Sequence, residues 1–186
     1  MYKICIMESS AQRQRELEQG FLSVLKLQDF EDLSISDLCK QLGITRKCFY
    51  RYFSGKEGAL NALLDHTLLD LSASLHPSTA EAFSSEVLES FFRFWQEQKI
   101  LLDVLERNGL SMLLYQRALH LATHEPDFSF GLLTDKNNAL QKQRILFVVC
   151  GMMTMIISWH HKKYQPPLKQ IVETARKLLT QPLFPQ

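Results

Sequence analysis

The chain has 186 residues, of which 46% are hydrophobic and 10% aromatic, so it can build a folded core and is not a disordered chain. Its formal net charge is only +1, which excludes a binder that relies on positive charge spread over its whole surface. The cysteines, Cys5, Cys39, Cys48 and Cys150, show no C-x-x-C spacing, so we expect reduced thiols rather than disulfides or a zinc site.

The first predicted element is a helix over about residues 9–28. Leu17, Phe21 and Leu25 recur at helical spacing and would form its buried stripe, and Phe30 then folds the chain back onto it. We expect a small core that also includes the next two helices. Its expected members are Leu17, Phe21, Leu25, Phe30, Ile35, Leu38, Leu42, Phe49 and Phe53.

The next two helices are predicted to form a helix-turn-helix. Ser34 is the expected N-cap of the first helix, which carries apolar residues at i, i+3, i+4 and i+7. Gly43 supplies the positive φ that ends it, and Thr45 caps the second helix. The tight turn therefore follows from local chemistry alone.

The second of these helices, at about residues 46–53, has an aromatic face and a basic face. No acidic residue occurs between Asp37 and Glu57, whereas basic residues are frequent there. They are Lys40, Arg46, Lys47, Arg51 and Lys56. A surface of this composition suits contact with the phosphates of nucleic acid.

The rest of the chain also has helical patterns. A long helix starts at Lys56 and should end before the His76–Pro77 pair. Further helices are expected near residues 87–95, 100–107, 110–124, 138–162 and 168–180, with loops at about 78–85 and 126–137 and a C-cap signal at Asn108–Gly109. The uncharged run Ile145–Trp159 is shorter than the ~20 residues that cross a bilayer, so we expect a buried helix and no membrane contact.

The helix-turn-helix stretch resembles the TetR family of bacterial one-component regulators. The matching residues are Phe30, Ile35, Asp37, Leu38, Gly43-Ile44-Thr45, Phe49-Tyr50-Arg51-Tyr52-Phe53 and Lys56-Glu57. The resemblance covers about residues 10–60 and is only architectural beyond. It implies an all-α fold of about nine helices, with a helix-turn-helix DNA-binding domain over residues 1–55 and a helical ligand-binding and dimerisation domain over residues 56–186.

The resemblance also implies which residues contact an operator. The expected DNA-binding residues are Ser34, Ser36, Thr45, Arg46, Lys47, Cys48, Tyr50, Arg51 and Lys56. Arg46, Lys47 and Cys48 are best placed for base edges, since arginine can bond guanine O6 and N7 together. Tyr50 and Lys56 are expected at phosphates, while Arg51 could equally be a solvated charge.

Three positions depart from the family pattern. Asp29 stands where the family usually has glycine, and Asp tolerates a left-handed backbone better than most residues. Lys47 and Cys48 replace a small residue and often threonine, which leaves the operator sequence open. Because Cys48 lies among basic residues, it could be a redox trigger as well as a packing or DNA-facing thiol.

The second half is rich in aromatic residues and methionine, which can line an apolar effector pocket or simply form the core. The candidate ligand-binding residues are Phe91, Phe94, Trp95, Met112, Tyr115, Met152, Met155 and Trp159. His120 and His124 have a metal-binding spacing, but no third ligand is evident nearby. We therefore expect neither a metal nor another cofactor.

Together these features predict a cytoplasmic, ligand-responsive homodimeric repressor that a small apolar or amphipathic effector releases from double-stranded DNA. The subunits would pair through the two C-terminal helices, where Cys150, Gly151, Thr154 and Ser158 allow close approach. The alternative is a TetR-like small-molecule-binding or adaptor protein that has lost DNA binding. An enzyme is not expected, because the chain has no phosphate-binding glycine loop, nucleophile elbow or H-E-x-x-H motif.

Overall fold

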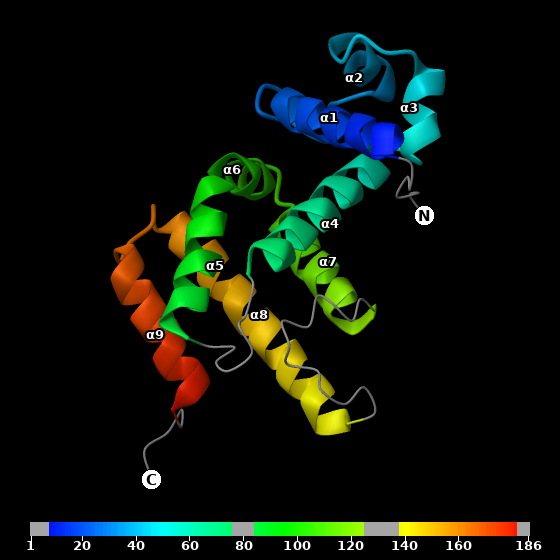
Figure 1. The fold of residues 1–186 in the computed structure, drawn as a ribbon. Coiled ribbons are helices and arrows are strands. Elements are labelled where there is room, and N and C mark those ends of the chain that lie inside the picture. The colour runs from blue at the N-terminus through cyan, green and yellow to red at the C-terminus, as the bar shows by residue number, and fades with distance from the viewer. Residues whose placement is uncertain (1–7, 76–83, 125–137, 182–186) are drawn as a thin grey trace. The chain divides into compact units, whose positions relative to one another are not determined.

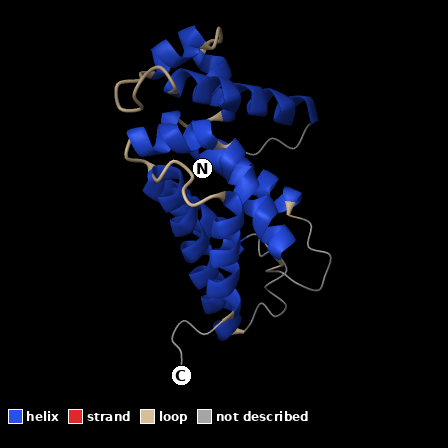
Figure 2. Ribbon diagram, turned by 90° about the vertical axis from the view of Figure 1, so that its left-hand side faces the viewer, coloured by secondary structure: helices blue, strands red, loops and turns tan. Residues whose placement is uncertain are grey.

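The computed structural model describes residues 8–75, 84–124 and 138–181. Within these ranges the chain forms helices and no strands, which confirms the predicted all-α fold (Figures 1 and 2). The helices are α1 (Glu8–Leu25), α2 (Ile35–Gln41), α3 (Arg46–Tyr52), α4 (Lys56–Ser74), α5 (Ser85–Glu97), α6 (Lys99–Arg107), α7 (Ser111–His124), α8 (Ala139–His161) and α9 (Leu168–Thr180). The loop expected at 126–137 and most of the one at 78–85 lie outside the described residues.

The chain divides into two compact units. The head unit consists of Met1–Thr67 with Asp103–Leu110, and the C-terminal unit of Leu68–Leu102 with Ser111–Gln186. Helix α4 therefore begins in the head unit and ends in the C-terminal unit, and α6 runs the opposite way. The boundary between residues 55 and 56, which was expected from the family pattern, stays a prediction.

The core of the head unit gathers the apolar stripes of its helices. Most of the residues expected there are buried, whereas Ile35 and Leu42 are only half-buried. The buried ones are Leu17, Phe21, Leu25, Phe30, Leu38, Phe49 and Phe53. Phe21 meets Phe30 edge-on with ring centroids 6.5 Å apart, so the chain after α1 is anchored back onto that helix.

A polar cluster is buried between α1 and α4 inside the head unit. Glu18 is 1% exposed, and its carboxylate oxygens lie 2.8 and 2.9 Å from Nδ1 of His66. The side-chain amide of Gln14 donates to the same carboxylate at 3.0 Å. Because a buried carboxylate is costly without partners, these contacts are what allow Glu18 to remain inside.

We expect Glu18→Ala to lower the free energy of unfolding by about 1–3 kcal/mol, because the imidazole of His66 and the amide of Gln14 lose their buried acceptor. Urea denaturation followed by circular dichroism measures this change. Glu16→Ala is the matched control, since Glu16 lies on the same helix, is exposed and pairs with Arg13. Equal losses in the two variants would show that the buried cluster adds nothing to stability.

The C-terminal unit packs α5 against α9 and α7 against α8, with further contacts from α8 to α5 and α9 (Figure 1). Trp159 on α8 is central to this packing. Its ring meets Phe92 edge-on at 5.5 Å and Tyr164 at 4.9 Å, and its indole N–H donates to the carbonyl of Pro166 at 2.6 Å. This tryptophan therefore ties the end of α8 to the segment that leads into α9.

Helix α8 carries no charged residue from Ile145 to Trp159, and only part of it is covered within the subunit. By length and composition it could cross a membrane, but the core helix of a soluble protein passes the same test. Only 28% of its most apolar 18-residue stretch is buried within the subunit, and the side chain of Phe147 is 66% exposed. Part of the apolar surface of α8 is therefore open within the subunit.

Candidate DNA-binding site

The turn between α2 and α3 has the expected geometry. Ser34 caps α2 by accepting the N–H of Asp37 at 3.1 Å, and Thr45 caps α3 by accepting the N–H of Cys48 at 3.1 Å. Gly43 has φ of +64°. The N–H of Gly43 reaches the carbonyl of Lys40, and that of Ile44 reaches Cys39, which together end α2 in a Schellman motif.

Helix α3 has one buried face and one open face. Phe49 and Tyr52 are 1% and 8% exposed and face the core of the head unit. Arg46, Lys47 and Arg51 are exposed, and Tyr50 is 46% exposed. The structure therefore brings four candidate DNA-binding side chains to the exposed side of α3. The buried aromatic residues on its other side pack this short helix against the core of the head unit.

The remaining polar candidates line the approach to α3. Ser34, Ser36 and Thr45 are exposed, although the hydroxyl of Ser34 also donates to the carboxylate of Asp37 at 2.6 Å. Arg46 lies with its guanidinium carbon 6.0 Å from the centroid of the Tyr50 ring. These two side chains therefore restrain each other weakly on the open face.

Lys56 is engaged by the protein itself. Its ammonium donates to the carbonyls of Phe30 at 2.7 Å and Glu31 at 3.0 Å, and lies 4.7 Å from the centroid of the Phe30 ring. Since an ammonium has three donors, at most one remains for a DNA phosphate. Its clearest role in this structure is to hold the loop after α1 against the start of α4.

The two cysteines of the helix-turn-helix differ in their surroundings. Cys39 is 3% exposed, and burial raises the pKa of its thiol, with Arg46 acting weakly in the opposite direction. Cys48 is half-buried on α3, and its backbone N–H is taken by the Thr45 cap. The redox role considered for Cys48 stays a hypothesis.

The candidate effector residues are distributed between core and surface. Phe91, Trp95, Met152 and Trp159 are buried, Phe94, Tyr115 and Met155 are half-buried, and Met112 is 64% exposed. The indole N–H of Trp95 is completely buried and finds no acceptor among the described residues. The hydroxyl of Tyr115 donates to that of Thr154 at 3.2 Å.

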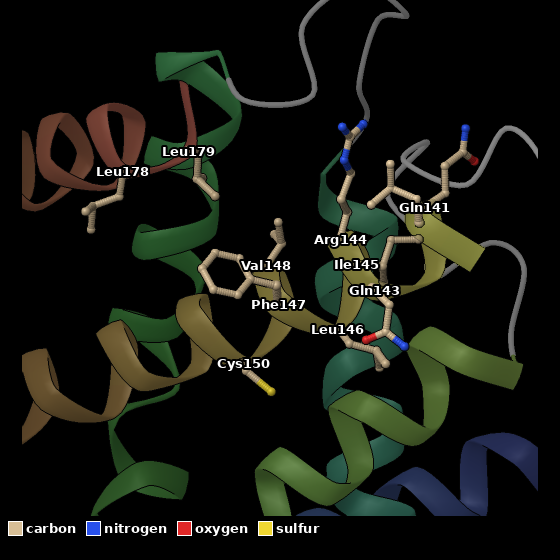
Figure 3. Close-up of a pocket in the computed structure, with 11 residues that line it drawn as sticks. Gln141, Gln143, Arg144, Ile145, Leu146, Phe147, Val148, Cys150, Leu178 and Leu179 are labelled. Atoms are coloured by element: carbon tan, nitrogen blue, oxygen red, sulfur yellow. The ribbon is translucent and has the colours of Figure 1, made fainter. Parts of the chain in front are cut away.

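A hollow of about 900 Å³ lies between the first half of α8 and the end of α9 (Figure 3). Figure 3 shows Leu178 and Leu179 of α9 on one side and Arg144 and Gln141 of α8 on the other. None of the candidate effector residues lines it. The hollow was not predicted from the sequence, because it depends on how α9 packs beside α8.

His120 and His124 stack with ring centroids 4.4 Å apart, and Nδ1 of His124 lies 2.9 Å from the carbonyl oxygen of His120. Among the described residues no group of three or more potential metal-ligating side chains comes together.

Residues 22–63, which contain the turn and the whole of α3, match the family model described as bacterial regulatory proteins, tetR family. These residues form a TetR-family helix-turn-helix domain. No curated protein sequence matches the chain closely enough to count as a relative.

Solved structures share the TetR fold over nearly the whole chain. A TetR-family regulator from Syntrophomonas wolfei is 15% identical with a TM-score of 0.68 and covers 94% of this chain and 98% of its own. The fatty acid degradation regulator FadR from Bacillus halodurans is 15% identical with a TM-score of 0.59, covering 94% and 97%. The dihydroxyacetone kinase operon activator DhaS is 15% identical with a TM-score of 0.56, covering 89% and 93%.

The TetR assignment makes this chain a transcriptional regulator that binds DNA. Members of this family bind operators, typically as dimers, and in general are not enzymes. The assignment was predicted from the block around α3, which is the part that the family model matches.

Proposed function

We propose that this TetR-family protein is a cytoplasmic homodimeric repressor that a small apolar or amphipathic effector releases from its operator. The observation that carries the DNA-binding part is the open basic face of α3, where Arg46, Lys47, Tyr50 and Arg51 stand on a buried aromatic anchor. A helix presented in this way fits the major groove of B-DNA. In a twofold dimer, two such helices would enter successive grooves about 34 Å apart.

The roles of the side chains follow from their chemistry and position. Arg46 and Lys47, in the first turn of α3, are proposed to read base edges, with Cys48 beside them. Thr45 and Tyr50 are proposed to contact phosphates. Further phosphate contacts are proposed for Ser34 and Ser36 at the start of α2, for Arg51, and for the remaining donor of Lys56.

The proposed dimer uses the exposed face of α8 together with α9. Cys150, Gly151, Thr154 and Ser158 are all exposed and lie at helical spacing along α8, and Phe147 extends the same stripe. Small residues allow two helices to approach closely, and an exposed phenylalanine gains most from being covered. The open apolar face of α8 supports this interface.

The proposed effector is apolar or amphipathic because the interior of the C-terminal unit is aromatic and rich in methionine. Phe94, Tyr115 and Met155 are half-buried and adjoin the buried set, so a ligand could reach them with modest rearrangement. The similarly folded FadR is a regulator of fatty acid degradation, which supports an apolar effector. Such a ligand acts as an inducer only if it binds the state that does not bind DNA more tightly.

The deciding experiment for the DNA-binding site is Arg46→Ala on a duplex selected from a random library by the wild-type protein. We expect this change to weaken binding to the selected duplex by about 1–3 kcal/mol and to relax preference at one base step, with little effect on random DNA. Tyr50→Ala should weaken binding to both DNAs alike. Fluorescence anisotropy titrations measure both affinities.

An equal loss on both DNAs for Arg46→Ala would assign that residue to a phosphate. A wild-type protein that selects no duplex would favour the alternative, a TetR-like ligand-binding or adaptor protein without DNA binding. Because DhaS is an operon activator, in vitro transcription from the selected site decides between repression and activation.

A further inference from the structure

The loop that follows α1 is hydrogen-bonded to side chains at the end of α6, a helix that is not part of the helix-turn-helix. We call residues 25–31 the α1–α2 corner. We propose that Arg107 and Asn108 are positioning residues for DNA binding, which act by fixing this corner and through it the placement of α2 and α3. This inference rests on the proposed DNA-binding function. It adds a role in DNA binding for the end of α6, which belongs to the head unit.

Arg107 completes the C-terminus of α1. Its guanidinium donates to the carbonyls of Leu25 and Lys26, the latter at 3.1 Å, and its Nε lies 3.1 Å from a carboxylate oxygen of Asp29. Helix α1 has no basic residue in its own last turn. Arg107 therefore supplies both the donors and the positive charge that the end of a helix favours.

Asn108 holds the next part of the corner. Its Oδ1 accepts the N–H of Phe30 at 2.7 Å, and its Nδ2 donates to the carbonyl of Val104 at 2.8 Å. The same side chain thus closes the last turn of α6 and satisfies a backbone donor beside a phenylalanine that is only 5% exposed. Since Lys56 takes the carbonyl of Phe30, both backbone polar groups of this residue are held by other elements.

The contact with Asp29 explains the departure from the family pattern at that position. Asp29 would tolerate a left-handed backbone, but the structure does not use one at this position. Among the described residues only Lys163 and Tyr164, besides glycines, have positive φ. The carboxylate of Asp29 instead pairs with Arg107. The residue that departs from the family pattern therefore contacts the same arginine that bonds to the α1–α2 corner.

Arg107 and Asn108 lie at the end of a helix that begins in the C-terminal unit, so a movement of that helix would change their contacts with the α1–α2 corner. Helix α6 begins at Lys99 in the C-terminal unit and ends at Arg107 in the head unit. The chain then returns to the C-terminal unit after Leu110. A displacement of α6 would therefore reach the α1–α2 corner through these side chains, in addition to any signal that α4 carries.

The test compares Arg107→Ala and Asn108→Ala with wild type on the selected duplex. We expect each to weaken binding by about tenfold, since one or two well-made hydrogen bonds are lost. The slope of log affinity against log salt should not change, because neither residue contacts a phosphate. A lost phosphate contact would lower that slope by about 0.9. Arg93→Ala is the matched control for charge, since Arg93 is exposed on α5 and pairs with Glu89.

Amide hydrogen exchange separates positioning from general destabilisation. In Asn108→Ala the N–H of Phe30 should exchange much faster while those of Leu38 and Phe49 do not change. Asn108→Asp keeps the acceptor for Phe30 but loses the donor to Val104, so it should restore the protection of Phe30 and most of the affinity. Unchanged exchange at Phe30, an unchanged affinity or a reduced salt slope would overturn the proposal. If wild type selects no duplex, the proposed function fails and the positioning role fails with it, while exchange at Phe30 still decides whether the contact forms.

Discussion

Gly151→Leu is expected to leave the subunit folded and to separate the dimer. A Cβ built at Gly151 meets nothing within 4 Å, so the side chain has room within the subunit. Leucine is also a better helix former than glycine, which is about 0.8–1 kcal/mol less favourable than alanine in a helix interior. In the proposed dimer, however, the two leucines would lie where α8 approaches its partner. Since the twofold axis repeats the substitution, we expect association to weaken by about 2–6 kcal/mol.

Sedimentation velocity over a range of concentrations measures this loss, and thermal denaturation of the separated subunits verifies that they remain folded. Gly151→Ala serves as a graded control with a smaller side chain at the same position. Affinity for the selected duplex should fall together with dimer content, because specific binding needs both recognition helices. A Gly151→Leu protein that remains dimeric at micromolar concentration would place the interface elsewhere on the surface.

Phe49→Ala is expected to remove the support of the recognition helix. Phe49 is 1% exposed, and its ring lies 5.2 Å from that of Phe53 and 5.7 Å from that of Tyr50. Truncating a buried phenylalanine costs about 3–5 kcal/mol, a large part of the ~5–15 kcal/mol that stabilises a typical domain. We expect the head unit to lose its cooperative fold near 37 °C and all specific DNA binding to disappear.

Tyr50→Ala provides the matched comparison, because Tyr50 is the next residue on the same helix but is 46% exposed. Its effect on the free energy of unfolding should stay within about 0.5 kcal/mol, although DNA binding weakens. Urea denaturation and anisotropy titrations on both variants separate the two effects. Equal destabilisation by the two substitutions would mean that the faces of α3 have been assigned incorrectly.

The helix-turn-helix could be predicted from the sequence because its determinants are local. Ser34 and Thr45 each bond to a backbone N–H three residues ahead, and Gly43 ends α2 through its own φ. The same holds at Gly109, whose φ of +66° ends α6 as the Asn108–Gly109 pair predicted. Helix boundaries elsewhere followed the apolar periodicity within a few residues.

The periodicity failed where a helix carries no charged residue over a long run. Along α8 the small residues indicated one interface face, but the apolar pattern did not predict that Phe147 and Leu140 would be exposed within the subunit. For the same reason it could not separate core from pocket among the effector candidates. The candidates predicted from the sequence included both Trp159, whose indole N–H donates to the carbonyl of Pro166, and Met112, which lies on the surface.

The sequence by itself determined the class of the fold, the place of the helix-turn-helix and the basic face of α3, since each depends on residues a few positions apart. Only the tertiary structure decided the partners of Lys56, of Glu18 and of Arg107. His66 is 48 residues from Glu18, and Asn108 is 78 residues from Phe30. Over such separations one charged side chain has many possible partners along the chain, and the packing of helices in space selects among them.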